Sequence, residues 1–214
     1  MRNLEQQLTS RGITGKNLLS AFAEVPREKF VAPALEQLAY ADRPLSIGFG
    51  QTISQPYIVA LTIDKMELQP GDEVLEIGTG SGYSAAVLSR VCAWVVSVER
   101  LPELAHTATE RLARLGYSNV TVICGDGTQG CPNHAPYDAI AVAAGGPQVP
   151  RALREQLKVG GRLVIPVGGA EEQSLVRVRR LSPTEFRQEQ ICKVRFVPLI
   201  GQQGWPEESD RSAP

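Results

Sequence analysis

The chain of 214 residues lacks the features that mark several large classes of protein. Its four cysteines are scattered without a C-x-x-C pair, which is typical of reduced thiols in a cytoplasmic protein. Lys and Arg number 22 against 23 Asp and Glu, so no excess of charge favours nucleic acid or an anionic membrane. No apolar run approaches the roughly 18 residues of a membrane-spanning helix, and the N-terminus has no apolar stretch like that of a signal peptide. We therefore expect a cytoplasmic protein that binds neither nucleic acid nor a membrane.

Histidine is also scarce, with two in the whole chain. His106 falls on a predicted amphipathic helix, and His134 follows Cys131 in a predicted loop. Cys131 and His134 supply at most half of a metal site, since a closed site needs four ligands, and no second half is found. Ser81 lies directly between two glycines, which does not fit the G-x-S-x-G pattern of a serine nucleophile. The sequence therefore predicts neither a metal centre nor a catalytic triad.

The most informative stretch runs from Val74 to Tyr83. A short apolar strand ends at Ile77, and Gly78, Gly80 and Gly82 then alternate with Thr79 and Ser81 before an apolar helix. Alternating glycines remove the Cβ atoms that would keep a ligand away from the backbone, and a helix start offers unpaired N–H groups. The spacing G-x-G-x-G differs from the G-x-G-x-x-G of dinucleotide sites, which disfavours an NAD oxidoreductase.

Acidic residues stand at the ends of this strand and of two later ones. Glu76 precedes the glycine turn, Glu99 ends an apolar strand at 94–98, and Gly125-Asp126-Gly127 follows another at 120–124. Glu99 is placed to accept hydrogen bonds from ribose hydroxyls, and the Gly-Asp-Gly turn lies near where a base would bind. These three signals, in this order, resemble the class I S-adenosylmethionine-dependent methyltransferases. An unrelated Rossmann-like protein is the alternative.

The resemblance implies an α/β, Rossmann-like fold that binds S-adenosylmethionine and releases S-adenosylhomocysteine. The cofactor-binding residues that it implies are Glu76, Gly78, Thr79, Gly80, Gly82, Glu99, Asp126 and Gly127.

The remaining segments predict a mostly parallel sheet flanked by helices, with additions at both ends of the chain. We expect an N-terminal helical cap over one sheet edge, further buried strands, and an antiparallel C-terminal hairpin. These segments are helices around 4–8, 18–22, 58–66 and 150–157, strands at 136–144 and 158–168, and hairpin strands at 174–181 and 186–197. Residues 1–200 are predicted to form a single domain, with the cap and a loop in 1–70 and the sheet and hairpin in 71–200. Residues 201–214 are expected to be a flexible tail.

A polar loop at 46–57 precedes the helix at 58–66. A polar, glycine-containing loop just before a nucleotide-binding fold can close over a ligand. Ser54 also suits the N-cap of the next helix, with Pro56 in its first turn. Both roles are compatible, because a capped turn is also rigid.

A family resemblance extends over nearly the full length of the chain, in residues 25–30, 50–57, 74–83, 125–127, 136–140, 160–168 and 194–199. In these stretches the sequence resembles the protein-L-isoaspartate O-methyltransferase family. The resemblance implies a repair enzyme that methylates the α-carboxylate of L-isoaspartyl residues, after which the ester collapses to a succinimide that yields some aspartate. Its partners would be isoaspartyl proteins and peptides, and we expect a monomer. By the family motif Ser54 is the catalytic residue, and Thr52, Ser54, Val197 and Pro198 bind the substrate.

One departure from the family pattern lies after the fourth strand, where many bacterial relatives have a threonine and a proline-rich turn. This chain has Ala143-Ala144-Gly145-Gly146-Pro147, which predicts a looser loop near the site. Two alternatives stay open at this point. The chain is either a methyltransferase acting on another carboxylate or a small molecule, or a module that recognises isoaspartyl sites without turnover.

Overall fold

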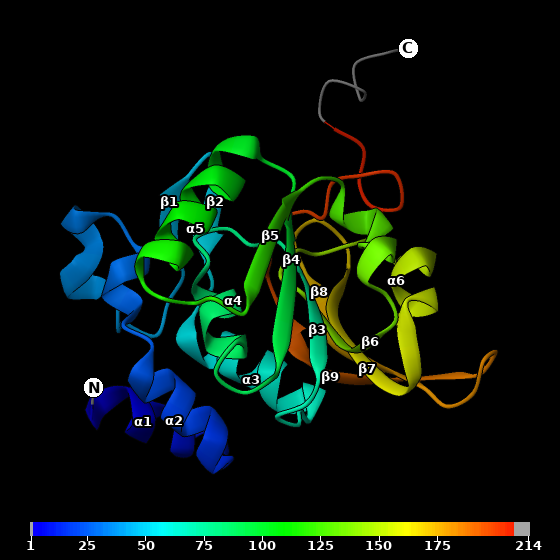
Figure 1. The fold of residues 1–214 in the computed structure, drawn as a ribbon, viewed down its shortest axis with the longest axis horizontal. Coiled ribbons are helices and arrows are strands. Elements are labelled where there is room, and N and C mark those ends of the chain that lie inside the picture. The colour runs from blue at the N-terminus through cyan, green and yellow to red at the C-terminus, as the bar shows by residue number, and fades with distance from the viewer. Residues whose placement is uncertain (1, 208–214) are drawn as a thin grey trace.

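The computed structural model describes residues 2–207, which form one large sheet with helices on both faces (Figure 1). The helices are α1 (Arg2–Thr9), α2 (Lys16–Glu24), α3 (Pro56–Met66), α4 (Tyr83–Leu88), α5 (Pro102–Arg114) and α6 (Arg151–Glu155). The strands are β1 (Leu45–Gly48), β2 (Gln51–Ile53), β3 (Glu73–Ile77), β4 (Trp94–Glu99), β5 (Val120–Cys124), β6 (Tyr137–Val142), β7 (Leu157–Gly168), β8 (Gln173–Arg180) and β9 (Phe186–Val194). Short 3-10 turns are η1 (Arg27–Phe30), η2 (Pro33–Leu38), η3 (Gly127–Gln129) and η4 (Pro132–His134).

The seven-stranded sheet has the order β5-β4-β3-β6-β7-β8-β9. Strands β3 to β7 pair in parallel, whereas β8 and β9 are added antiparallel. Four of the residues of β3 are buried in succession, as expected of a parallel strand that is covered on both faces. The predicted α/β, Rossmann-like fold with a C-terminal antiparallel hairpin is therefore confirmed.

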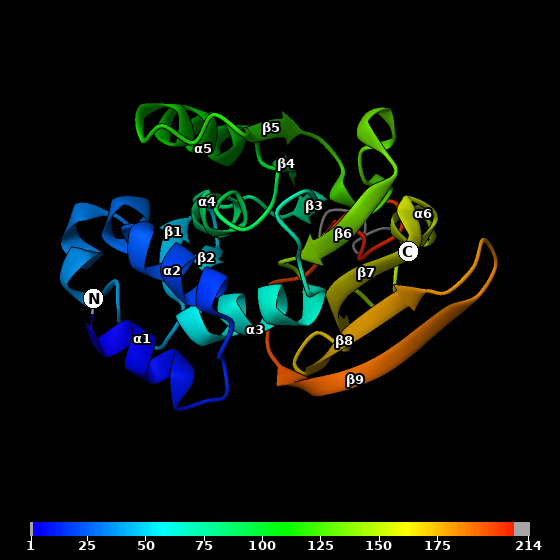
Figure 2. The ribbon, with the colours of Figure 1, turned by 60° about the horizontal axis from the view of Figure 1, so that its bottom comes forward.

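Two apolar layers cover the sheet, one on each face (Figure 2). Helices α3, α4 and α5 lie on one face, and α6 lies on the other. The N-terminal helices α1 and α2 pack on α3 and α4, and their apolar residues share a core with that face of the sheet. The cap therefore forms an outer layer over helices, and the prediction that it covers a sheet edge is wrong. The edges are β5 and β9.

The loop at 46–57 contains a small antiparallel hairpin, β1–β2, which the sequence analysis missed. Its strands are three and four residues long, too short for a clear alternation of apolar and polar residues. The turn residues Phe49 and Gly50 both have positive φ, 53° and 69°, as the tight turns favoured in hairpins require. Ile47 of this hairpin lies against Gly80, so the hairpin packs directly on the glycine turn.

Residues 201–207, which follow Ile200, are anchored to the rest of the fold. Trp205 donates through its indole Nε1 to the Gly145 carbonyl at 3.0 Å, and Gln202 N donates to Asp126 Oδ2 at 2.9 Å. The prediction of a flexible tail from residue 201 is wrong for 201–207, because backbone and indole donors anchor this polar segment. Residues 208–214 of that prediction lie outside the described residues.

Candidate active site

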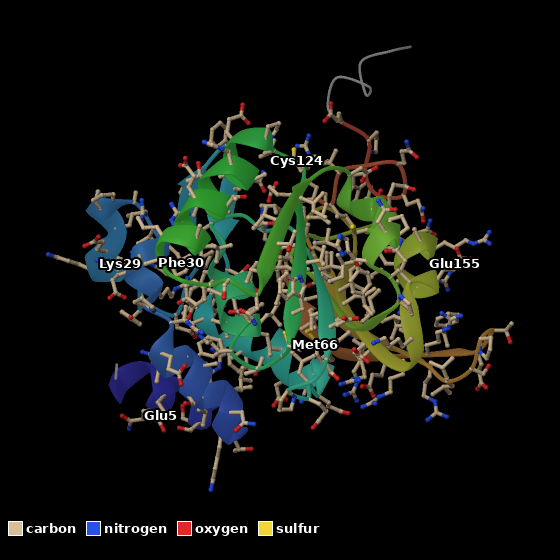
Figure 3. All side chains as sticks on the ribbon, viewed as in Figure 1. Glu5, Lys29, Phe30, Met66, Cys124 and Glu155 are labelled. Carbon is tan, nitrogen blue, oxygen red and sulfur yellow. The ribbon has the colours of Figure 1, made fainter. Side chains whose placement is uncertain are left out.

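A cavity of about 570 Å³ opens at the carboxyl ends of the parallel strands. Cys124, at the end of β5, marks this side of the sheet in Figure 3, and the C-terminal segment lies on the same side. Parallel strands bring the loops that follow them to one edge, where ligands of this fold class bind. The cavity is lined by residues 50–54 from the hairpin loop, Ile58, Val59 and Thr62 from α3, 76–81 and 98–101 from the ends of β3 and β4, Tyr83 and Ser84 from α4, Gly127, 141–144, 196–200 and Glu207.

Most of the predicted site residues come together in this lining. Those that line the cavity are Thr52, Ser54, Glu76, Gly78, Thr79, Gly80, Glu99, Gly127, Val197 and Pro198. Gly82 and Asp126 are outside it.

The glycine turn adopts a backbone conformation that side chains rarely permit. Gly78, Gly80 and Gly82 have φ of 91°, 53° and 88°, all in the left-handed region that glycine tolerates. A Cβ on Gly82 would come within 3.3 Å of Leu112 on α5. Gly82 therefore allows α5 to pack against the turn, whereas Gly78 and Gly80 form the wall of the cavity.

Glu99 connects the glycine turn to the end of β4. Its Oε2 accepts a hydrogen bond from Gly80 N at 2.8 Å, and its Oε1 accepts one from Leu101 N at 3.0 Å. The side chain is buried but lines the cavity. A carboxylate oxygen can accept more than one hydrogen bond, so both oxygens keep capacity for a ligand's hydroxyl groups.

Glu76 is a second buried carboxyl group in the lining. Ser97 donates to its Oε2 at 2.5 Å, and the hydroxyls of Ser97 and Thr79 are 2.6 Å apart. Burial raises the pKa of Glu76 to about 7, although the hydroxyls of Ser84 and Ser97 oppose the shift. Its Oε1 is buried and has no partner among residues 2–207. Unpartnered buried oxygens are rare, and this one is an acceptor inside the cavity.

Asp126 does not reach the cavity with its carboxylate. Its Oδ1 accepts from the backbone N and the hydroxyl of Thr128 at 2.8 and 2.7 Å, and its Oδ2 accepts from Gln202 N. These contacts cap η3 and anchor the C-terminal segment. The side chain is thus occupied by structural contacts, and the neighbouring Gly127 is the member of this motif that lines the cavity.

Ser54 lies at the end of the hairpin loop, where it lines the cavity. It is not the N-cap of α3, because Gln55 takes that position without a side-chain cap. Asp42 serves the helix start instead: its Oδ1 accepts from Tyr57 N at 3.2 Å and its Oδ2 from Gln55 Nε2 at 2.7 Å. The Ser54 hydroxyl is therefore not used in capping the helix.

The opposite wall is a strap at residues 195–199 that pairs with the loop after β6. Gly145 N donates to the Val197 carbonyl and Leu199 N donates to the Gly145 carbonyl, both at 2.8 Å. Gly146 N also donates to Pro166 O at 3.0 Å. The prediction of a looser loop at 145–146 is wrong, because the loop is paired on both sides. A Cβ on Gly145 would come within 2.9 Å of the buried Gln173 side chain, so glycine permits this close pairing.

Several lining residues were missed by the sequence analysis. Ile58 and Thr62 are one turn apart on α3, a spacing that places them on the same face of a helix and was a usable signal. Arg100 and Glu207 form an ion pair at 2.6 Å, but they are 107 residues apart and no local pattern joins them.

Some sequence features lie away from the site. Cys131 and His134 belong to the loop at η4, where the Cys131 carbonyl accepts from the Tyr137 hydroxyl at 2.8 Å. Residues 2–207 contain no group of three or more His, Cys, Asp or Glu side chains arranged to hold a metal ion. The helices of this range include none with the length and apolarity that crossing a membrane requires.

Comparison with known proteins gives consistent results. Residues 1–204 match the profile of the family described as protein-L-isoaspartate(D-aspartate) O-methyltransferase. The chain is 58% identical to protein-L-isoaspartate O-methyltransferase 2 of Pelobacter propionicus, over 94% of this chain and 90% of that protein. It is 52% identical to the enzyme of that name from Rhodopseudomonas palustris, over 98% of each chain.

Solved structures agree with the sequence matches. A protein-L-isoaspartate O-methyltransferase superposes with a TM-score of 0.86 at 35% identity, covering 95% of this chain and 67% of that one. A Plasmodium falciparum protein of the same description, in complex with S-adenosyl-L-homocysteine, gives a TM-score of 0.81 at 25% identity and covers 92% and 97%. The chain therefore belongs to the protein-L-isoaspartate(D-aspartate) O-methyltransferase family.

Proposed function

We propose that the cavity is the active site of this methyltransferase, with cofactor bound at the ends of β3 and β4 and substrate between Ser54 and the 195–199 strap. The reaction of the family is the transfer of a methyl group from S-adenosylmethionine to the α-carboxylate of an isoaspartyl residue. The observation that carries the assignment is that Ser54 and the glycine turn line one and the same cavity. Direct transfer of a methyl group requires that cofactor and substrate bind side by side in one cavity.

The residues of the cavity fit the cofactor. Gly78 and Gly80 give the backbone access that a bulky ligand needs, and Glu99 is placed to accept hydrogen bonds from ribose hydroxyls. The unpartnered Oε1 of Glu76 suits an ammonium or hydroxyl donor. Gly127 lets the turn after β5 pack closely on Ile77 at the cavity wall, since a Cβ there would fall 2.4 Å from Ile77 Cγ2. When bound, S-adenosylmethionine supplies the methyl group, which passes to a carboxylate oxygen as its bond to sulfur breaks.

The chain's own contribution is positioning and the exclusion of water. A substrate carboxylate is ionised at neutral pH, so no residue has to remove a proton from it. The Ser54 hydroxyl donates a hydrogen bond to that carboxylate and fixes its orientation, with Thr52 beside it. Val197 and Pro198 form the apolar side of the slot. Correct orientation alone can lower a barrier substantially, which accounts for a site without a general base.

The methyl ester then needs no further residue of this chain. It collapses to a succinimide when the neighbouring backbone nitrogen attacks the ester carbonyl and displaces methanol, which takes the proton of that nitrogen, and hydrolysis of the succinimide returns some normal aspartyl linkage. We further propose that the enzyme acts as a monomer in the cytoplasm, on isoaspartyl proteins and peptides, without nucleic acid, membrane or metal. The balanced charge of the chain and its unpaired cysteines support this proposal. Light scattering of the purified protein tests the monomer.

The decisive experiment offers radiolabelled S-adenosylmethionine and two peptides that differ only in an isoaspartyl or a normal aspartyl linkage. Methylation of the isoaspartyl peptide alone is the expected result. Labelling of neither peptide, with cofactor binding intact, would favour a different carboxylate substrate or recognition without turnover. Absence of cofactor binding would contradict the assignment of the cavity.

A further inference from the structure

Arg27, in the 3-10 turn η1, has a fully buried guanidinium group. Its side chain is 0% exposed, and Nε donates to the Ala39 carbonyl at 2.7 Å. Its Nη2 donates to the carbonyl of Ser54 at 2.8 Å, and the group lies over the ring of Tyr83, 4.7 Å from the centroid. A side chain of the N-terminal cap therefore holds the backbone of Ser54, the residue that we propose binds the substrate carboxylate.

The charge of Arg27 has no counterion at ion-pair distance within residues 2–207. Asp42, whose charge acts on Arg27, accepts hydrogen bonds from Arg11, Gln55 and Tyr57. Glu28, the next residue in the chain, accepts from the Tyr40 hydroxyl at 2.5 Å. Burial without a counterion lowers the pKa of the guanidinium, yet arginine stays charged in proteins. An unpaired buried charge is costly to a fold, which makes a purely structural role a poor explanation for this arginine.

The acidic lining of the cavity suggests a role for the positive charge of Arg27. The acids in the lining are Glu76, Glu99 and Glu207, and its one arginine, Arg100, is bound to Glu207. Such a lining favours a cationic cofactor but repels an anionic substrate. Arg27 stands directly behind Ser54, outside the lining, and its field acts where the carboxylate would bind. Because the surroundings are buried, water screens this field weakly.

We propose that Arg27 is a positioning residue that fixes the Ser54 loop and offsets the acidic cavity for a carboxylate substrate. This inference rests on the proposed function of Ser54. Arginine suits the task because its rigid fork donates to two carbonyls at once while keeping its charge, which lysine cannot match. The Tyr83 ring beneath it and the Ala39 carbonyl beside it hold the fork in place.

The test compares Arg27→Gln with a matched control, Arg162→Gln. Arg162 also donates through Nε and Nη2 to two backbone carbonyls, those of Met66 and Glu67, but at the other end of α3, away from the cavity. Figure 3 labels Met66 at that end. Each variant is measured for melting temperature, for affinity for S-adenosylhomocysteine, for affinity of the isoaspartyl peptide to the cofactor-loaded enzyme, and for peptide KM.

Arg27→Gln is expected to weaken peptide binding and raise peptide KM by about tenfold, with cofactor affinity unchanged within about twofold. Arg162→Gln is expected to lower the melting temperature alone. Arg27→Lys keeps the charge but can keep only one of the two carbonyl contacts, so a rise in peptide KM of about threefold is expected. This variant replaces Arg27→Gln in the test if the glutamine variant does not fold. Unchanged peptide affinity in a folded Arg27 variant would overturn the inference. A wild-type enzyme that fails to methylate the peptide would instead contradict the proposed function.

Discussion

Gly80 N donates a hydrogen bond to Glu99 Oε2 at 2.8 Å, joining the glycine turn after β3 to the last residue of β4. We propose that the Glu99 carboxylate binds the ribose of the cofactor and that the glycine turn binds the rest of it. The same carboxylate therefore also holds the glycine turn in place. Leu101 N occupies the other oxygen, Oε1, at 3.0 Å. These two segments of the cavity lining are therefore coupled through one side chain.

Glu99→Ala is expected to weaken cofactor binding by at least about tenfold, since hydrogen bonds to an ionised acceptor contribute roughly 1.5–3 kcal/mol. Loss of the contacts to Gly80 and Leu101 should also lower the melting temperature. Calorimetric titration with S-adenosylhomocysteine measures the affinity. Glu103→Ala, an exposed acid in the first turn of α5, is the matched control. Wild-type affinity in Glu99→Ala would show that the ribose lies elsewhere.

Ser54→Ala is expected to lower turnover by roughly ten- to a hundredfold, because the substrate carboxylate loses its orienting donor. The protein should stay folded and cofactor affinity should hold, since the Ser54 hydroxyl caps no helix. Initial rates with an isoaspartyl peptide measure the effect. Ser46→Ala, an exposed serine in the same hairpin, should keep full activity. A Ser54→Ala enzyme with normal turnover would contradict the proposed role.

The parallel part of the sheet was predictable because its strands contain short runs of buried apolar residues, such as Val74 and Leu75 in β3 and Val95 and Val96 in β4. Such runs can be recognised without knowledge of the neighbouring strands. The hairpin β1–β2 escaped prediction because it is held by a turn at Phe49 and Gly50 and by packing of Ile47 on Gly80. The packing of Ile47 on Gly80 is a tertiary contact, which leaves little mark on the nine-residue stretch 45–53.

The site was predictable where a motif placed a residue at a strand end, as for Glu76 and Glu99. Asp126 is predicted to bind the cofactor, but sequence alone did not show that its short acidic side chain accepts from the N–H of Thr128 in its own tight turn and from the distant Gln202 N. Arg27 lies in a stretch that matches the family, but the local sequence did not indicate its role. The residues that it contacts, Ala39 and Ser54, lie 12 and 27 residues away in the chain. Chemistry that depends on such distant pairs needs the folded structure.

Glu76 should make the stability of the ligand-free enzyme depend on pH. Burial raises its pKa from 4.5 to about 7, so the folded protein binds a proton that the unfolded chain releases. The corresponding stabilisation is complete below the unfolded pKa and is lost as pH rises through about 7. The groups that face it are Ser97 from β4 and Ser84 from α4, which lower the pKa, and Glu99, which raises it.

Glu76→Gln removes this titration and keeps a similar shape. Between about pH 5 and pH 8, the melting temperature of the wild type is expected to fall relative to that of the variant. Binding of a cofactor whose ammonium group meets Oε1 should favour the ionised carboxyl and release a proton near neutral pH. Calorimetry in buffers of different ionisation enthalpy measures that release. Parallel melting curves for both proteins at every pH would exclude a raised pKa at Glu76.

The segment 201–207 should matter for cofactor binding although it follows the last strand. A chain that ends after residue 207 keeps Trp205 and Glu207, and it is expected to match the full-length protein in melting temperature and cofactor affinity. A chain that ends after residue 200 loses the indole contact to Gly145, the contact from Gln202 to Asp126, and the partner of Arg100. Both its melting temperature and its cofactor affinity should fall.

Trp205→Phe isolates one of these contacts in the full-length chain. Phenylalanine keeps an aromatic ring but cannot donate to the Gly145 carbonyl, so that oxygen loses a hydrogen bond of about 1 kcal/mol. Gly145 also pairs with the strap at Val197 and Leu199, and loosening it should raise peptide KM more than it weakens cofactor binding. Steady-state kinetics with the isoaspartyl peptide and calorimetry with the cofactor separate the two effects. Equal effects on both ligands would mean that the segment orders the whole cavity and not the strap in particular.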